Sequence, residues 1–231
     1  MPVGDLPGWK QVFADNFSQS VPTGKFPQAV AAKWSAYQDG WKDTSKFGTY
    51  YPSKVVSIHD GMMDLHLRTE NGVPMVSAPE PKIAGSTGGQ LYGRYAVRYK
   101  ADAIAGYKVA WLLWPDSDVW TEGEINFPEG DLTDRAWGFM HHRGNPTAQD
   151  WYETSATFAS WHTAVLEWTP TSVRFTMDGK VVGTSTDATK IPRTPMHWVL
   201  QTETAINGTK PPVASDGHVY IDWVAAYSRV A

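Results

Sequence analysis

The sequence predicts an all-β protein built as a sandwich of two antiparallel sheets, and three observations lead to this prediction. Short runs that alternate apolar and polar residues recur along the chain, as in residues 93–100. Turn signals rich in Gly, Pro, Asn and Asp separate these runs at short intervals. No amphipathic pattern with helical spacing lasts for two turns. Together these features favour a β-sandwich.

The expected strands are rich in β-branched and aromatic residues and are bounded by turn residues. In chain order they are residues 55–59, 62–68, 93–100, 164–168, 173–177, 181–182 and 219–227. Asp60-Gly61 joins the first two as a hairpin, and Asp178-Gly179 joins the fifth and sixth, because Asp-Gly favours a tight hairpin turn. Residues 69–89 and 202–217, rich in Pro, Gly, Ser and Thr, are expected to be loops.

Composition limits the size of the fold and the class of partner. The chain has 231 residues, of which 42% are hydrophobic, and we expect one domain over residues 1–231. With 20 basic and 24 acidic residues the net charge is −4, which argues against nucleic acid or an anionic membrane as partner. A neutral polysaccharide is the more compatible partner, and we expect a monomer. The absence of cysteine excludes disulfides and thiolate metal sites.

The N-terminal segment bears on localisation. Its first 25 residues contain Pro2, Pro7 and Pro22 and lack the apolar stretch of a signal peptide. No run of about 18 apolar residues occurs, so no membrane span is expected. We expect a secreted protein whose signal peptide has already been removed.

The most informative stretch runs from Glu124 to Glu129. In a regular strand Glu124 and Asn126 share a face, whereas Glu129, five residues after Glu124, points away. A β-bulge adds one residue and restores the shared face, and proline is tolerated at bulges. We therefore predict a bulge near Pro128 that brings Glu124, Asn126 and Glu129 onto one face.

Paired carboxyl groups beside aromatic rings point to glycosidic bond cleavage. A separation of about 5 to 5.5 Å favours retention of configuration, and one of roughly 6.5 to 9.5 Å favours inversion. The chain holds 12 Trp and 10 Tyr, whose rings fill cores and also stack on sugars. Two alternatives stay open from the residues alone. The glutamates are solvated surface charges, or Glu122 pairs with Glu124, since these two share a face without a bulge.

This stretch resembles the active strand of glycoside hydrolase family 16, which reads Glu-x-Asp-x-x-Glu in its bulged form. The chain departs from it at one position, where Asn126 replaces the aspartate. Further landmarks of the family occur in order along nearly the whole chain: Phe13-Ala14-Asp15-Asn16-Phe17, Asp60-Gly61, Tyr92-Gly93-Arg94-Tyr95, Ala110-Trp111-Leu112-Leu113, Trp161-His162-Thr163, Glu167-Trp168, Asp178-Gly179 and Ile221-Asp222-Trp223-Val224. The resemblance implies a concanavalin-like β-jelly roll.

The resemblance also implies an activity and the roles of three residues. It implies a retaining endo-glycosidase that hydrolyses β-linked glucan, with β-1,3 or mixed β-1,3/1,4 bonds, by double displacement and without a required cofactor. Glu124 is then the nucleophile, and Glu129 is the general acid and base. Asn126 keeps the hydrogen-bonding capacity of aspartate but lacks its charge. Because a nearby negative charge makes a carboxyl group harder to ionise, Asn126→Asp should extend activity to higher pH.

Six substrate-binding residues follow from the resemblance: Trp111, Trp114, Trp120, His141, Arg94 and Gln201. The three tryptophans are expected to stack on sugar rings, with packing between the sheets as the alternative for each. The histidine is expected within reach of the general acid. The arginine and the glutamine are expected on strands that face the cleft, where they would bind hydroxyl groups, or else they are solvated side chains.

A structural calcium ion is the one metal that the resemblance implies. Many family members bind calcium on the convex face, and the matching positions are Asn16, the carbonyl of Gly61 and Asp222. Calcium prefers several oxygen ligands that include carboxylates. Asn16 replaces the usual acid, which weakens this prediction.

Three alternative functions remain open. An enzyme of the same fold acts on a galactan, or it transfers glycosyl units to sugars instead of water. A sulfated galactan would call for basic residues, and near the motif only Arg135 and Arg143 occur. The third alternative is a lectin-like protein that binds carbohydrate without turnover, which Asn126 keeps open and the two intact glutamates oppose.

Overall fold

The computed structural model describes residues 1–83, 88–205 and 209–230. The strands are β1 (Trp9–Asp15), β2 (Trp34–Ala36), β3 (Thr49–Tyr50), β4 (Val56–His59), β5 (Met62–Glu70), β6 (Val73–Val76), β7 (Pro79–Pro81), β8 (Gly93–Ala101), β9 (Tyr107–Pro115), β10 (Glu124–Asp131), β11 (Arg135–His142), β12 (Asn145–Thr157), β13 (His162–Trp168), β14 (Val173–Met177), β15 (Lys180–Ser185), β16 (Met196–Thr204) and β17 (Asp216–Arg229). The helical segments are η1 (Gln28–Val30), α1 (Pro52–Val55) and η3 (Trp120–Glu122).

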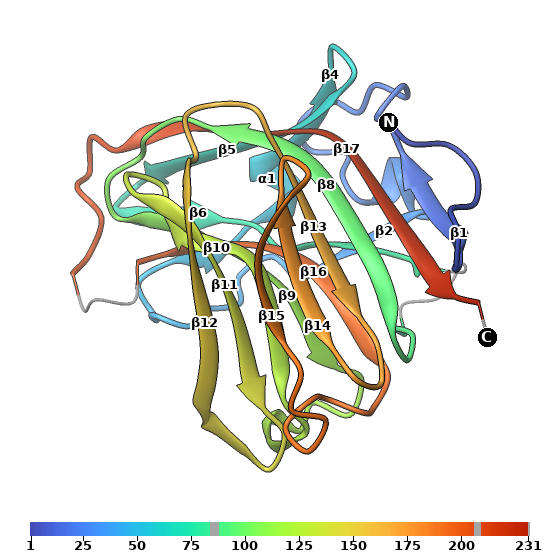
Figure 1. Cartoon of the computed structure of the whole chain (residues 1–231). Helices are drawn as coiled ribbons and strands as arrows, with labels where there is room; N and C mark the ends of the chain where they lie inside the picture. The colour runs from blue at the N-terminus through green and yellow to red at the C-terminus, as the bar shows by residue number, and fades with distance from the viewer. Residues whose placement is uncertain (84–87, 206–208, 231) are drawn as a thin grey trace.

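The described strands form two large sheets and a small one, in which β2 pairs with β7. Among the described residues, ten strands form one sheet, in which β15, β14, β13, β8, β17, β5, β6 and β3 follow one another and β1 and β4 pair with β17 and β5. Five strands form the other sheet in the order β12, β11, β10, β9, β16. Figure 1 shows the closing strand β17 running alongside β8, far from it in sequence. Such crossovers between antiparallel strands are the jelly-roll arrangement, so the predicted fold class is confirmed.

The core lies between the inner faces of the two sheets. Aromatic rings of the ten-stranded sheet meet rings of the five-stranded sheet edge-on, with centroids 5.0 Å apart for Tyr99 and Trp111 and 5.4 Å apart for Tyr95 and Trp198. All four side chains are almost fully buried. Such pairs add about 0.5–1.5 kcal/mol each beyond the burial of area. Packing of this kind fixes which face of each strand is left for solvent or substrate.

The predicted strands are confirmed, and the predicted loops are partly wrong. Residues 69–89 contain the end of β5 and all of β6 and β7, and the segment 202–217 begins inside β16 and ends inside β17. The prolines of this segment were interpreted as loop residues, but proline is also tolerated in edge strands. In the described structure β7 is such a strand, since it pairs with the short β2 alone. Residues 88–89 and 209–215 contain no strand, as predicted, and residues 84–87 and 206–208 lie outside the described residues.

The helical segments are short. No helix in the described ranges is long and apolar enough to cross a membrane.

Candidate active site

Strand β10 carries the predicted bulge. Its register against both neighbouring strands shifts between Asn126 and Glu129. Ile125 and Phe127 point into the core, with exposed fractions of 0% and 2%. Glu124, Asn126 and Glu129 line the same hollow on the other face. The predicted bulge and the shared face are therefore present.

The hollow is part of a longer cleft across the outer face of the five-stranded sheet. It has a volume of about 450 Å³ and adjoins a second hollow of about 460 Å³. The residues that line both are Thr44, Leu112, Trp120, Glu124 and Gln201. The cleft thus passes over β10, β9 and β16, with the glutamates near its middle.

The two glutamates are held by different donors. The Trp120 indole Nε1 donates to Glu124 Oε2 at 2.8 Å. The Asn126 amide Nδ2 donates to Glu129 Oε2 at 2.7 Å, and the Lys108 ammonium donates to Glu129 Oε1 at 2.6 Å. Both oxygens of Glu129 therefore accept hydrogen bonds, an arrangement that suits an ionised carboxylate.

Burial dominates the electrostatics of Glu124. Loss of solvent raises the pKa of Glu124 above its ordinary value, and the nearby charge of Glu129 adds to the rise. The His141 ring and hydrogen bonds from Asn126 and Trp120 oppose this shift without cancelling it. The amide of Asn126 thus donates to Glu129 and lies close enough to Glu124 to lower its pKa.

Lys108 is a site residue that the sequence prediction missed. Its side chain is 6% exposed and lies 4.0 Å from Glu203 as well as in contact with Glu129. Burial by itself lowers the pKa of Lys108, but the two carboxylates raise it above its ordinary value. The available signal was a lone lysine near the start of β9, whose other residues are almost all buried.

The wall of the cleft beyond β16 is the loop of residues 41–48, which is hydrogen-bonded to that strand. The buried carboxylate of Asp43 accepts hydrogen bonds from the backbone N–H of Thr204, at 2.8 Å, and from Gly48. The backbone N–H of Thr44 donates to Glu203 at 3.1 Å. These bonds hold the exposed ring of Trp41 at the rim of the cleft.

Four of the six predicted binding residues lie in this cleft. Trp114, Trp120 and Gln201 line the hollows, and His141 lies opposite Glu124 in the register of β10 and β11. The His141 Nδ1 bonds to the carbonyl of Pro146 at 2.8 Å, which leaves its Nε2 for the cleft. Their roles toward a substrate stay predictions.

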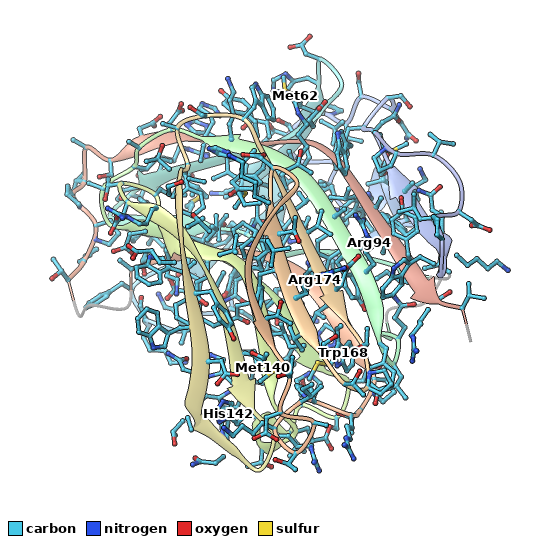
Figure 2. The ribbon with its side chains drawn as sticks, viewed as in Figure 1. Met62, Arg94, Met140, His142, Trp168 and Arg174 are labelled. Atoms are coloured by element: carbon cyan, nitrogen blue, oxygen red, sulfur yellow. The ribbon has the colours of Figure 1, made fainter. Side chains whose placement is uncertain are left out.

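The other two predicted binding residues lie elsewhere, so those predictions are wrong. Trp111 is 0% exposed and packs against Tyr99 in the core, because it sits on the inner face of β9. Arg94 lies on β8 of the ten-stranded sheet, where its Nε donates to Glu167 at 3.2 Å. Figure 2 shows Arg94 over the same part of that sheet as Arg174, which binds the same glutamate.

The alternative partner Glu122 is also excluded from the cleft. It lies in the turn η3 instead of the strand, and the Ser117 hydroxyl donates to its Oε2 at 2.7 Å. Glu122 does not belong to the described lining of either hollow.

The cleft face continues over β11 and β12 as an aromatic strip that the prediction also missed. We define this aromatic strip as Trp137, Phe139 and Trp151. The Trp137 ring stacks on Phe139 at 6.4 Å between centroids and lies 5.7 Å from Trp151. Trp151 is 59% exposed, which is unusual for so large a ring. Aromatic surface therefore flanks the glutamates on both sides.

The predicted calcium ligands meet at one end of the ten-stranded sheet. Register pairs Asp15 with Val224, so Asn16 comes near Asp222, and the turn at Gly61 lies beside β17. The Arg98 guanidinium, however, binds the carboxylate of Asp222 at 2.5 Å. A cation already holds the one carboxylate of the set, which fits calcium poorly. Calcium stays a prediction, and thermal unfolding with calcium against a chelator tests it.

Comparisons with known proteins give one family match and several structural matches. The model of the glycosyl hydrolases family 16 matches residues 43–225. No curated protein matches the sequence. Among solved structures, SCLam, a non-specific endo-β-1,3(4)-glucanase, is 18% identical, with a TM-score of 0.79 over 100% of this chain and 95% of its own.

Two further structures are similar. The laminarinase catalytic domain from Thermotoga maritima is 16% identical, with a TM-score of 0.76 over 96% of this chain and 99% of its own. The β-glucanase of Bacillus licheniformis is 19% identical, with a TM-score of 0.73 over 94% and 98%. At these identities the structural likeness establishes the fold alone, including its concanavalin-like jelly roll.

Proposed function

The chain belongs to family 16 of the glycosyl hydrolases, and we propose that it cleaves β-linked glucan, with β-1,3 or mixed β-1,3/1,4 bonds, within the polymer. The observation that carries the proposal is the pair Glu124 and Glu129 on one face of β10, in a cleft flanked by aromatic rings. Three similar structures, described as glucanases or a laminarinase, support the substrate class.

The first step transfers the glucosyl unit to the enzyme. The carboxylate of Glu124 attacks the anomeric carbon, the glycosidic C–O bond breaks, and Glu129 gives its proton to the leaving oxygen. The indole N–H of Trp120 holds the attacking carboxylate in place. Asn126 donates to Glu129 and lies next to Glu124, so we expect the two carboxyl groups to lie close together, and a short separation favours retention.

The second step releases the product. Glu129, now ionised, takes a proton from a water molecule, whose oxygen attacks the anomeric carbon and frees Glu124. Lys108 and Asn126 both donate to Glu129 and so stabilise it in this ionised form. They favour the second step and oppose the first, in which Glu129 must hold a proton.

The charges of the cleft favour a neutral polymer over a sulfated galactan. The described lining carries three cations against four carboxylates: Lys42, Lys46 and Lys108 against Asp43, Glu124, Glu129 and Glu203. The best buried cation is already paired with two of these acids. A sulfated chain would meet net negative charge here, which costs binding energy.

Action within the chain is supported by the length of the aromatic surface. Trp41, Trp114 and Trp120 lie on one side of the glutamates, and the aromatic strip of β11 and β12 lies on the other. Rings on both sides can stack on sugar units before and after the scissile bond. An open cleft of this kind admits the middle of a polymer.

The experiment is reducing-sugar release from laminarin, lichenan, agarose, carrageenan and xyloglucan, with Glu124→Gln as control. We expect release from laminarin or lichenan that the control abolishes. Release from agarose or carrageenan alone would contradict the glucan assignment. No release from any polymer, with laminarin bound equally by both proteins, would favour a lectin-like protein instead.

A further inference from the structure

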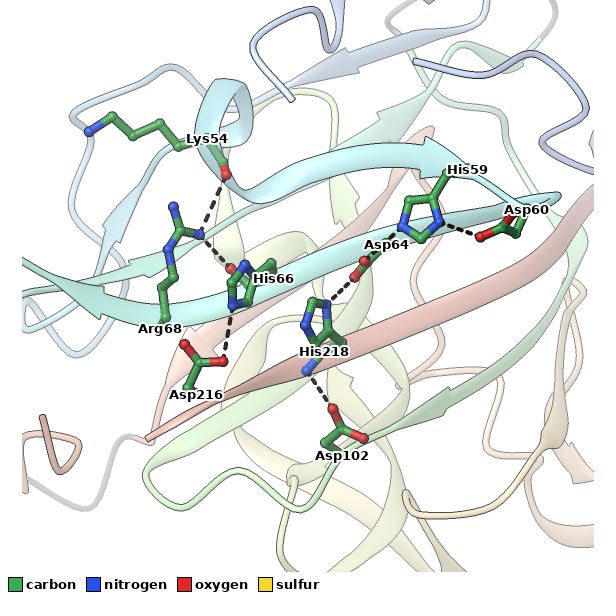
Figure 3. A network of polar contacts seen from close by, with 9 residues as sticks. All are labelled: Lys54, His59, Asp60, Asp64, His66, Arg68, Asp102, Asp216 and His218. Carbon is green, nitrogen blue, oxygen red and sulfur yellow. Dashed lines mark hydrogen bonds and ion pairs between the residues drawn. The ribbon is translucent and has the colours of Figure 1, made fainter. Parts of the chain in front are cut away.

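A second cluster of polar side chains lies on the outer face of the ten-stranded sheet, away from the cleft. On β5 the residues Met63, Leu65 and Leu67 point into the core, so His66 between them points outward. On β17 the same alternation turns Asp216 and His218 outward. Figure 3 shows these side chains beside one another on the two neighbouring strands.

His66, Asp216 and His218 have the spacing of metal ligands. His66 lies opposite His218 in the register of β5 and β17. The His66 Nε2 is 3.0 Å from Asp216 Oδ1. One ligand atom of each residue lies within 4.8 Å of those of the other two, and among the described residues no other group of three His, Cys, Asp or Glu side chains meets this spacing.

A buried carboxylate orients one of the two imidazoles. The His218 Nδ1 donates to Asp64 Oδ1 at 2.7 Å, and the Asp64 side chain is only 7% exposed. The other oxygen of Asp64 accepts from His59 Nε2 at 3.0 Å. With Nδ1 as the donor, the Nε2 of His218 carries the lone pair. Metal-binding histidines are typically fixed in this way by a carboxylate on their second nitrogen.

We propose that His66, Asp216 and His218 form a binding site for a divalent transition-metal ion of the zinc type. Imidazole nitrogens and a carboxylate suit zinc, nickel and copper, whereas calcium and magnesium prefer sites made of oxygen alone. Three protein ligands leave a fourth position of a tetrahedral ion for water. The site lies on the solvent side of the sheet, so an ion reaches it without opening the fold.

Binding requires a local rearrangement of the two rings. The His66 and His218 rings are stacked, with centroids 4.3 Å apart and an angle of 11° between their planes. Their lone pairs therefore lie in parallel planes, and one ring must turn about its Cβ–Cγ bond to face a shared ion. His66 turns more freely because its described side-chain hydrogen bond is to the exposed Asp216, whereas His218 is held by the buried Asp64.

The site is distinct from the predicted calcium position. His218 and Asp222 are four residues apart on β17, which corresponds to about 13 Å along a strand. Tyr220 lies between them on the same face, with its ring stacked against His218.

Binding of zinc is measured on protein treated with a chelator and then dialysed. Titration calorimetry with ZnCl₂ should give one ion per chain, with a heat that depends on the buffer because binding releases protons. Zinc at about 100 times the dissociation constant should raise the melting temperature by roughly 5 to 10 °C. Any shift that calcium gives at the same concentration should be unchanged in Asp216→Asn, because the predicted calcium position lies elsewhere on β17.

Three variants test the assignment. His218→Gln and Asp216→Asn should abolish the site, and Asp64→Asn should weaken binding about 10- to 100-fold by loosening His218. The control is His162→Gln, which removes a histidine bonded to Asp178 at 2.6 Å in a simple pair and should leave zinc binding unchanged. The Asp216 side chain is 61% exposed, so its variant should fold normally, as circular dichroism verifies.

Two results would overturn the proposal. One is the absence of saturable zinc binding by the chelator-treated protein. The other is equal binding by the parent and by correctly folded Asp216→Asn and His218→Gln. Release of sugar from glucan is measured in parallel, and its presence or absence concerns the cleft only.

Discussion

Removal of the buried ammonium with Lys108→Met should change both the pH dependence of activity and the stability. Lys108 donates to Glu129 at 2.6 Å and favours its ionised form, whereas the first chemical step needs the protonated form. The fall of kcat/KM at high pH reports loss of that proton. Without Lys108 the proton is lost less readily, so this fall should move to higher pH.

Both effects follow from the geometry. Lys108→Met removes the charge-assisted hydrogen bond to Glu129 Oε1, so we expect the high-pH limb of the kcat/KM profile to move toward higher pH. Breaking a buried pair costs about 3–5 kcal/mol, because Glu203, with 3% of its side chain exposed, loses its partner. For a chain of this length the melting temperature should fall by roughly 6–20 °C.

A second prediction follows from the direction of the Lys108 pKa. It is raised in the folded protein, so the ion pair contributes its full stability below the ordinary lysine value and loses it only as pH rises through the raised value. The stability difference between parent and variant should therefore be constant across neutral pH.

The assay is kcat/KM on laminarin from about pH 4 to 9, at a temperature where all variants are folded. The double variant Lys108→Met with Glu203→Gln should recover stability, because the buried acid no longer needs a cation, and should keep the displaced profile. Lys100→Met is the matched control, since the Lys100 ammonium lies over the Trp161 and Tyr220 rings on the other sheet. A folded double variant with the parent's profile would refute the reasoning.

Three further predictions concern the cleft. Asn126→Asp should also extend activity to higher pH. The new carboxyl oxygen would lie where the amide nitrogen now lies, 2.7 Å from Glu129 Oε2, and two carboxyl oxygens at that distance need a proton between them. An unchanged pH–rate profile would contradict this. Trp120→Phe should lower kcat about 10- to 100-fold with little change in KM, because it removes a hydrogen bond to Glu124 worth about 1.5–3 kcal/mol. Trp151→Ala should raise KM for laminarin about 2- to 10-fold, the loss of one stacked ring, while kcat/KM for a disaccharide glycoside stays unchanged; equal effects on both substrates would exclude a role in binding the polymer.

The bulge of β10 was predictable because it depends on local rules. Glu124 and Glu129 are an odd number of residues apart, so they can share a face of the strand only if a bulge adds one residue between them. Pro128 indicates the position of that bulge, because proline is tolerated there. Both facts can be read from six consecutive residues. The shared face of the glutamates was therefore available from the sequence alone.

Trp111 and Arg94 were misplaced because their positions depend on tertiary structure. Strand β9 is apolar on both faces, one packed against the other sheet and one forming the floor of the cleft, so no alternation marks which side Trp111 takes. Arg94 alternates clearly on its strand, but the sequence does not tell which of two sheets that strand joins. In the folded protein Trp111 lies on the inner face, where its ring packs against Tyr99 of the other sheet.

Lys108 and the aromatic strip were missed for a related reason. The pairing of Lys108 with Glu129 joins neighbouring strands across 21 residues of sequence, and that register is fixed only once the bulge is in place. Trp151 joins the strip because β12 pairs with β11 at Phe139. Cross-strand neighbours of this kind need a register that the sequence does not supply.

The most direct test of the account is the anomeric configuration of the first product. Proton NMR during the early hydrolysis of a laminari-oligosaccharide distinguishes the α and β anomers before they equilibrate. Double displacement at Glu124 predicts that the β anomer forms first, at a rate that Glu124→Gln abolishes. Initial formation of the α anomer would contradict the proposed roles of Glu124 and Glu129.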